Sequence, residues 1–274
     1  MSRTTAEKRA AFRAMHDSGC FILPNPWDVG SAKYLASLGF KALATTSSGF
    51  AWSTGRADNH VTRETILAHL SAIVAATDLP VNADFENGFG SAPDEVAQSV
   101  TMGIATGVAG LSLEDSTGDA ATPLMPIDAA AERIAAARRA IDRSGGDTLL
   151  IGRAENFVVG VHDLDDAIDR LKAYADAGAD CLYAPGIKTR EQIEAVVAAV
   201  APKPVNVLVG SVSPFTLGDL AAMGVRRVSV GGALARSAWG GFMAAAQALT
   251  DGRFDGFAGA ASGAQLDAQF LDEA

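Results

Sequence analysis

The chain has 274 residues, of which 49% are hydrophobic and 20% are charged, and its formal net charge at pH 7 is −10. This length can bury a large core as one big domain or two small ones, and the composition suits an ordered α/β protein and not a disordered chain. The acidic balance argues against a nucleic-acid partner, because neutralising phosphates requires a basic face.

Neither a membrane segment nor a secretory signal is expected. No apolar run reaches the roughly 20 residues that span a bilayer, and residues 1–17 alternate charged and small side chains without a signal-peptide apolar core. The two cysteines, Cys20 and Cys181, have no metal-type spacing. We therefore expect buried, reduced thiols in a cytoplasmic protein.

Short apolar runs alternate along the chain with segments of helical periodicity. Four of the runs follow a glycine that can end a helix, since the residue after a helix often adopts the left-handed conformation that glycine tolerates. The eight expected strands lie at residues 21–24, 39–44, 80–84, 107–113, 149–153, 178–183, 204–209 and 224–230.

Amphipathic helices are expected between these strands. Residues 62–77 and 163–177 place apolar side chains on one face. Thr189 begins a capping box with Gln192, and Ser213, followed by proline, predicts a helix start. Eight such units without a linker predict an α/β protein, a single (β/α)8 TIM-type barrel with a C-terminal helical extension. A doubly wound open sheet is the alternative.

The barrel is expected to cover residues 1–240 and to form the catalytic domain. Residues 241–274 are expected to form the helical extension. Within and beside it, residues 240–250 and 264–271 have helical character, and the intervening residues 252–263 are rich in glycine. A tail of this kind is expected to leave the barrel and pack on a neighbouring subunit; a frayed terminus is the alternative.

Acidic residues gather at the expected strand ends, which in barrels of this type form the active site. Asp84 and Glu86 are two residues apart, so on an extended backbone both carboxylates lie on one face, and Glu114 ends the next strand. Like charges side by side in an interior call for a cation. An all-oxygen donor set favours Mg2+, with Mn2+ second, whereas the four histidines have no spacing typical of zinc.

Arg153 ends the fifth expected strand, where its guanidinium can bind a substrate carboxylate through two hydrogen bonds. The alternative role is a structural ion pair with Glu155 or Glu114. Gly49 follows two serines, so backbone N–H groups there can approach an anionic oxygen. The pair Gly231-Gly232 ends the eighth strand and leaves a phosphate site open. No nucleophile elbow or dinucleotide fingerprint is present.

Six motifs along the chain match one family in order and position. The chain resembles the isocitrate lyase/phosphoenolpyruvate mutase superfamily over nearly its whole length. The motifs are Pro24-Asn25-Pro26-Trp27-Asp28 with Ser31-Ala32, Ser47-Ser48-Gly49-Phe50, Gly55-Arg56-Ala57-Asp58, Asp84-Phe85-Glu86-Asn87-Gly88-Phe89-Gly90, Leu113-Glu114-Asp115 and Gly152-Arg153-Ala154-Glu155.

The resemblance implies a barrel with Mg2+-dependent chemistry on small 2-oxo or 2-hydroxy acids. It implies homotetramers in which a C-terminal helix is exchanged between subunits. By position, Asp84 is the main metal ligand, and Asp58, Glu86 and Glu114 act through waters. Substrate binding is implied for the backbone amides of Ser48 and Gly49 and for the side chains of Trp27, Arg153 and Asn206.

The loop after the fourth strand departs from the lyases of this superfamily. They carry a catalytic cysteine in a basic loop, whereas residues 115–123 contain no cysteine, lysine or histidine. The chain is therefore similar to the subgroup that includes oxaloacetate decarboxylases. It is expected to be a carbon–carbon lyase that cleaves a small 2-oxo (di)carboxylate through a metal-stabilised enolate, with Asp58 moving a proton or positioning water and residues 115–126 as a lid.

Two other functions stay open. The chain can be a hydrolase or mutase acting on C–C or C–P bonds of related 2-oxo acids, because the same electrostatics serves those reactions. It can also bind 2-oxo acids with little catalysis, having lost the usual acid.

Overall fold

The computed structural model of the protein describes residues 3–271 and has a sheet of eight parallel strands at its centre. Each strand begins within one of the eight runs expected from the sequence. The strands are β1 (Phe21–Leu23), β2 (Leu43–Ala44), β3 (Val81–Asp84), β4 (Gly110–Glu114), β5 (Leu149–Arg153), β6 (Cys181–Tyr183), β7 (Val205–Leu208) and β8 (Arg227–Ser229).

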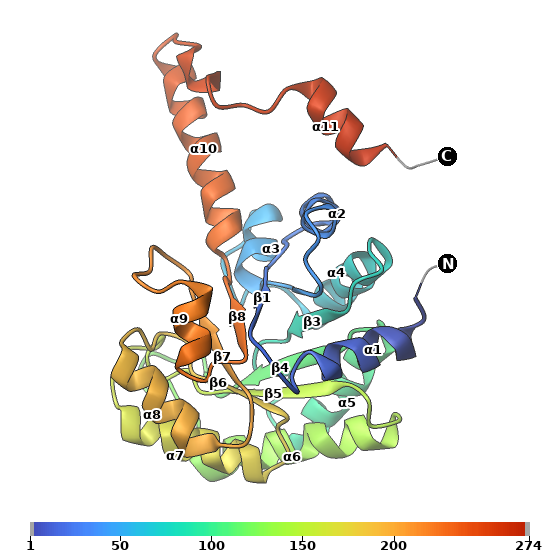
Figure 1. Cartoon of the computed structure of the whole chain (residues 1–274), viewed down its shortest axis with the longest axis vertical. Coiled ribbons are helices and arrows are strands. Elements are labelled where there is room, and N and C mark those ends of the chain that lie inside the picture. The colour runs from blue at the N-terminus through green and yellow to red at the C-terminus, as the bar shows by residue number, and fades with distance from the viewer. Residues whose placement is uncertain (1–2, 272–274) are drawn as a thin grey trace.

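The sheet curls into a barrel. Its strand order is β1-β8-β7-β6-β5-β4-β3-β2, and the amide of Ala44 in β2 donates to the carbonyl of Pro24, directly after β1, at 3.0 Å. Helices connect successive strands and surround the sheet (Figure 1). The predicted (β/α)8 barrel with a C-terminal helical extension is therefore confirmed, and the open-sheet alternative is wrong.

The helices follow the expected amphipathic segments. Thr62 and Thr189 cap the helices that were predicted to start there, and Thr189 forms the expected reciprocal box with Gln192. The helices are α1 (Thr5–Ala14), α2 (Val29–Ser37), α3 (Ser47–Ser53), α4 (Arg63–Ala75), α5 (Pro93–Ala105), α6 (Ile127–Arg143), α7 (Leu164–Asp176), α8 (Arg190–Val200), α9 (Leu217–Ala222), α10 (Ala233–Thr250), the 3-10 helix η1 (Asp255–Phe257) and α11 (Gly263–Phe270).

The helix start predicted at Ser213 is wrong. The Ser213 hydroxyl accepts from the amide of Phe215 and closes a local turn. Helix α9 begins four residues later, at Leu217, because Thr216 caps it and shares a reciprocal capping box with Asp219. Ser213 and Thr216 both have a hydroxyl that could cap a helix. Thr216 forms the capping box because Asp219 lies three residues after it.

Two hydrophobic layers hold the barrel. The larger lies between the strands and the surrounding helices, and a second cluster fills the barrel interior. Phe12 of α1 belongs to this second cluster together with Leu149 and Cys181, so α1 covers the end of the barrel where the strands begin. Cys181 is buried, as expected, whereas Cys20 is only half-buried; both are free thiols.

The boundary expected between residues 240 and 241 falls inside helix α10, which runs without a break from Ala233 to Thr250. In Figure 1, α10 rises away from the barrel and the chain turns through η1 to α11, which contacts α2. Residues 1, 2 and 272–274 of the two expected segments lie outside the described part of the chain. Within residues 3–271, no helix is long and apolar enough to cross a membrane.

Replacing Leu111 by alanine tests the outer core. Leu111 is fully buried in the larger cluster, so Leu111→Ala should lower the free energy of unfolding by about 2–5 kcal/mol through lost burial and the cavity left behind. Leu38→Ala is the matched control, because Leu38 is 57% exposed; its effect should stay within about 0.5 kcal/mol. Equal losses in urea unfolding would contradict this packing.

Candidate active site

Three predicted site residues end three neighbouring strands. Asp84 is the last residue of β3, Glu114 of β4 and Arg153 of β5. Glu114 and Arg153 are also direct partners in the sheet register. Because the strands are parallel, their carboxyl ends meet at one end of the barrel, and the structure brings these side chains into contact there.

Arg153 is the centre of this cluster. Its Nη1 lies 3.1 Å from Asp84 Oδ1 and 3.2 Å from Glu114 Oε2. Its Nη2 donates to Glu155 Oε2 at 3.1 Å and its Nε donates to the other oxygen of Glu155, so one carboxylate holds the guanidinium by two bonds. The Tyr183 ring lies 5.3 Å from the guanidinium carbon. The ion pairs that the sequence allowed as an alternative role are therefore formed with both glutamates.

Carboxyl groups outnumber cationic groups in this cluster. Burial raises the pKa of Glu114 and of Glu155, although Arg153 opposes the shift. Burial and the neighbouring charge of Asp84 raise the pKa of Glu86 to about 8. Burial disfavours the charged guanidinium, but the surrounding carboxylates hold the pKa of Arg153 above its ordinary value, so it stays charged. The cluster can accommodate a second cation.

Glu86 is the clearest candidate ligand for a second cation. Its φ is 46°, so the backbone leaves the extended conformation directly after β3. The side chain is buried and its Oε1 has no hydrogen-bond partner. In the described chain, no three His, Cys, Asp or Glu side chains are already arranged to hold a metal ion. The unpartnered oxygen and the oxygen donors of Asp84, Glu86 and Glu114 nevertheless fit a hard divalent cation.

Ser47 contacts Asp84 through its backbone, since its amide donates to Asp84 Oδ2 at 3.0 Å. Its side chain favours the charged form of Asp58, against the effect of burial on the pKa of that carboxyl. Thr45 holds the backbone of Asp84, since its hydroxyl accepts from the Asp84 amide at 2.9 Å. Burial and the charge of Asp84 raise the pKa of Asp58. The sequence motifs included Ser47, but only the next two residues, Ser48 and Gly49, were predicted to bind substrate.

Trp27, Ser48 and Gly49 lie together at the barrel mouth. A Cβ added at Gly49 would lie 2.7 Å from Thr46 Cγ2 and 3.0 Å from Trp27 Cβ, so only glycine fits there. The Gly49 amide donates to the capping hydroxyl of Thr46 at 3.3 Å. A Cβ on Gly232 would lie 2.9 Å from the Ser48 hydroxyl. The segments after β1, β2 and β8 therefore converge on these residues.

Asn25 ties the same segments together and was not predicted. Its side-chain nitrogen donates to the carbonyl of Thr45 at 2.8 Å, and its side-chain oxygen accepts from the amides of Val230 and Gly231, each at 2.9 Å. The Gly231 amide is therefore engaged by the protein itself. This contact weakens the case for the phosphate site that the glycine pair left open.

Asn206 lies inside the barrel and is fully buried. Its side-chain oxygen accepts from Arg227 Nε at 2.8 Å, and its nitrogen donates to the Ser229 hydroxyl at 3.0 Å. In the sheet register, Tyr183 is the partner of both Asn206 and Arg153. Both ends of the amide are thus engaged within the protein, and strand β6 separates Asn206 from Arg153. Nothing in the sequence indicated a role for Tyr183 or Arg227.

Asp115 anchors the segment that carries Glu155. Its Oδ1 accepts from the Glu155 amide at 2.8 Å, and its Oδ2 accepts from Arg170 at 3.0 Å and from the Tyr174 hydroxyl. The loop that follows, residues 116–124, is closed by an antiparallel bridge between its first and last residues. This loop contains no cysteine, lysine or histidine, so it offers the cluster no thiol, ammonium or imidazole as a proton donor.

Three known proteins illustrate what the chain is similar to. An oxaloacetate decarboxylase from Rhodopseudomonas palustris (strain BisB5) is 32% identical over 256 residues, covering 89% of this chain and 86% of the relative. A crystal structure from Burkholderia cenocepacia J2315 is 49% identical with a TM-score of 0.93, covering 98% of this chain and 97% of that chain. The structure of a phosphonopyruvate hydrolase with oxalate and Mg2+ is 29% identical with a TM-score of 0.82, covering 96% and 94%.

The family model described as phosphoenolpyruvate phosphomutase matches residues 12–250. This match includes all eight strands and the carboxyl-end cluster. It agrees with the resemblance carried by the six sequence motifs. The chain is therefore an enzyme of the phosphoenolpyruvate mutase family, within the isocitrate lyase/phosphoenolpyruvate mutase superfamily.

Proposed function

We propose that the protein is a Mg2+-dependent carbon–carbon lyase for a small 2-oxo (di)carboxylate, with oxaloacetate decarboxylation as the leading reaction. The observation that carries the proposal is the charge balance at the strand ends, where Arg153 alone faces Asp84, Glu114 and Glu155. The similarity to an oxaloacetate decarboxylase over 89% of the chain supports this choice of reaction.

Asp84, Glu86 and Glu114 would hold the ion, with Asp58 acting through water. Mg2+ is the first candidate and Mn2+ the second, because the donors are all oxygen. The chemistry that the ion supplies when bound is Lewis-acid stabilisation of the negative charge that C–C cleavage leaves on the substrate. The phosphonopyruvate hydrolase structure, which contains oxalate and Mg2+, supports this assignment.

Arg153 and the barrel mouth would bind the substrate. The guanidinium is pre-oriented by two bonds to Glu155. A substrate carboxylate would compete with Asp84 and Glu114 for its Nη1 edge. The backbone of Ser48 and Gly49 and the side chain of Trp27 lie together at the mouth and can position the second carboxylate. The loop of residues 115–126 would close over the substrate and exclude water.

Asp58 would carry the proton that the reaction needs. Its raised pKa, caused by burial and by Asp84, keeps a proton on this carboxyl more readily than on an ordinary aspartate. In a decarboxylation the departing group is CO2, which leaves without being protonated. A site without a cysteine acid is therefore sufficient, and Asp58 can protonate the remaining carbanion afterwards.

Hydrolysis or rearrangement of a C–C or C–P bond is the second candidate, and the similarity to phosphonopyruvate hydrolase favours it. Product analysis separates the two: oxaloacetate gives pyruvate and CO2 by decarboxylation but oxalate and acetate by hydrolysis. Phosphonopyruvate hydrolysis releases phosphate. A binding protein with little activity would be stabilised against heat by these acids without forming any product.

The C-terminal extension supports a homo-oligomer, with a tetramer of exchanged helices as the expected form. Large apolar side chains on it face solvent within one chain: Phe242 is 61% exposed, Met243 63%, Phe254 74% and Phe257 51%. So many large exposed apolar side chains on one segment are uncommon on a monomer and are typically covered by a partner in an assembly. We propose that a second copy of this chain covers it.

Replacing Asp84 tests the site. Asp84→Asn keeps the side-chain shape but removes the charge, so kcat/KM for oxaloacetate should fall by about 10²–10³-fold and the dependence of turnover on Mg2+ should be lost. Glu64→Gln is the control, because Glu64 is an exposed acid on α4. Unchanged turnover and Mg2+ dependence in Asp84→Asn would refute the assignment.

Glu86 makes stability depend on pH in the absence of divalent ions. Its pKa of about 8 in the folded protein exceeds the ordinary glutamate value of 4.5. Between these values the unfolded chain has lost a proton that the folded chain keeps, so the free energy of unfolding should fall as pH rises from about 5 to 8. In EDTA, Glu86→Gln should reduce this fall by at least about 1 kcal/mol in urea titrations, whereas exposed Glu132→Gln should not. Parallel profiles for the wild type and Glu86→Gln would contradict the burial of this acid.

The extension can be tested by its mass in solution. Sedimentation of the wild type should give a species several times heavier than 28.1 kDa, and Phe242→Ser should shift the population towards smaller species. Val212→Ser is the control, since Val212 is fully exposed on a barrel loop. A monomeric wild type would reject the exchanged-helix assembly.

A further inference from the structure

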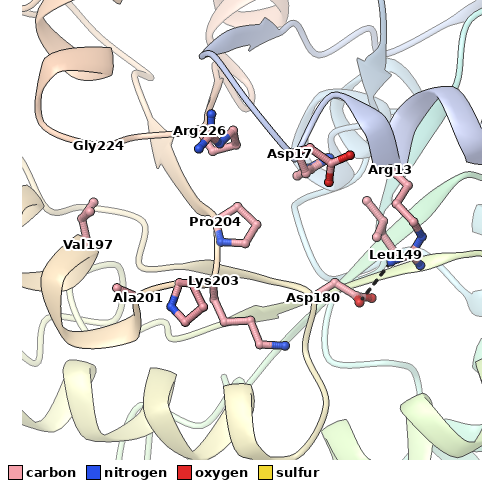
Figure 2. Close-up of a pocket in the computed structure, with 12 residues that line it drawn as sticks. Arg13, Asp17, Leu149, Asp180, Val197, Ala201, Lys203, Pro204, Gly224 and Arg226 are labelled. Carbon is pink, nitrogen blue, oxygen red and sulfur yellow. Dashed lines mark ion pairs between the residues drawn. The ribbon is translucent and has the colours of Figure 1, made fainter.

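A hollow of about 420 Å3 lies at the opposite end of the barrel from the acidic cluster (Figure 2). It is formed where strands begin: Leu149 opens β5, Pro204 precedes β7 and Arg226 precedes β8. The end of α1 contributes Arg13 and the loop after α8 contributes Lys203. We call this site the basal hollow. Its volume lies within the range of pockets that bind small molecules.

Three cationic side chains surround the basal hollow, and two of them are held by backbone carbonyls. Lys203 Nζ donates to the carbonyl of Ala179 at 2.9 Å, and Arg226 donates to the carbonyl of Gly19. Neither forms an ion pair with a carboxylate among residues 3–271. The third, Arg13, lies 3.5 Å from Asp180, the ion pair drawn in Figure 2. The cations are thus held in place, and the three positive charges outnumber the two carboxylates, Asp17 and Asp180, that line the hollow with them.

The acids of the basal hollow do not cancel this charge. Asp180 is already bound by Arg138 at 3.1 Å and by the amide of Leu150 at 2.8 Å. Asp17 is exposed at the rim. The whole chain has a net charge of −10, so a cationic hollow runs against its overall balance and concentrates anions locally.

His16 lines the hollow as a buried, neutral side chain. Its Nδ1 lies 2.8 Å from the carbonyl of Phe12, which can only accept, so Nδ1 carries the proton. Burial and the charge of Arg227, with smaller effects from Arg13 and Arg226, lower the pKa of His16 to about 3. The imidazole therefore stays neutral at physiological pH and adds no positive charge to the hollow.

We propose that the basal hollow is a binding site for a small doubly charged oxyanion, a phosphate group or a dicarboxylate, separate from the catalytic centre. Arg13, Lys203 and Arg226 supply charge-assisted donors from three different segments of the chain. Phosphate and carboxylate oxygens accept from guanidinium and ammonium groups in the same way. The volume leaves room for a ligand larger than the anionic group itself.

Calorimetric titration at constant ionic strength tests this site, with inorganic phosphate and succinate as probes. The wild type should bind one of the two saturably. Lys203→Gln and Arg13→Gln should each weaken that binding by about fivefold to tenfold, because each removes one charged donor. Lys172→Gln is the matched control, since Lys172 is an exposed lysine on α7. Arg13 is itself 43% exposed, so its substitution leaves the fold intact.

Each outcome decides the proposal. Binding of phosphate alone identifies a phosphate group, and binding of succinate alone identifies a dicarboxylate. Equal affinity in Lys203→Gln, Arg13→Gln and Lys172→Gln would place the anion elsewhere and overturn the proposal. Absence of binding of either probe at millimolar concentration would overturn it as well. Catalytic turnover is not needed for the readout, so a wrong substrate assignment leaves this test unaffected.

Discussion

The site depends on the contact of one guanidinium with three carboxylates at the ends of the strands. Arg153 reaches Asp84 at 3.1 Å, Glu114 at 3.2 Å and Glu155 by two bonds. Moving each of these charges out of water costs several kcal/mol, and pairing offsets only part of that cost. The part of the desolvation cost that pairing does not offset raises the pKa of Glu114 and Glu155. Binding a divalent cation would relieve the same imbalance, which links the electrostatics of the fold to its chemistry.

The barrel makes this contact possible by holding the chain rigidly on either side of it. Glu114 and Arg153, the last residues of β4 and β5, are partners in the sheet register, and Asp84 at the end of β3 lies opposite Ser112 of β4. Behind them, Asp115 binds the backbone of Glu155 and is fixed in turn by Arg170 and Tyr174. The arginine is therefore oriented by one carboxylate whose own backbone is anchored to helix α7. Pre-orientation of this kind is what substrate binding and transition-state stabilisation require.

Much of this arrangement could be predicted because it depends on local patterns. Buried runs ending in a polar residue located Asp84, Glu114 and Arg153, and parallel strands imply that such ends meet. Glu86 was predicted on the assumption of an extended backbone, whereas its φ of 46° turns the chain there. The Glu86 carboxylate points towards the cluster because the backbone bends at this residue, and not because side chains alternate along a strand. The spacing of Asp84 and Glu86 in the sequence is the same for both conformations.

Other parts depend on contacts between distant segments. Tyr183 lies against Arg153 only because β6 follows β5 in the barrel, and Arg227 binds Asn206 across β7 and β8. Ser47 bonds to Asp84 through a backbone amide, which any residue carries. Single-sequence reasoning sees side-chain type and periodicity, so it misses roles that belong to the backbone or to register between strands.

A crystal structure with Mg2+ and oxalate would test the central claim most directly. The account predicts one ion at the carboxyl end of the barrel with Asp84 among its ligands, oxalate beside Arg153, and Arg153 still held by Glu155. An ion bound elsewhere, or a site in which Arg153 keeps its contacts with Asp84 and Glu114 while neither Mg2+ nor oxalate binds, would contradict it.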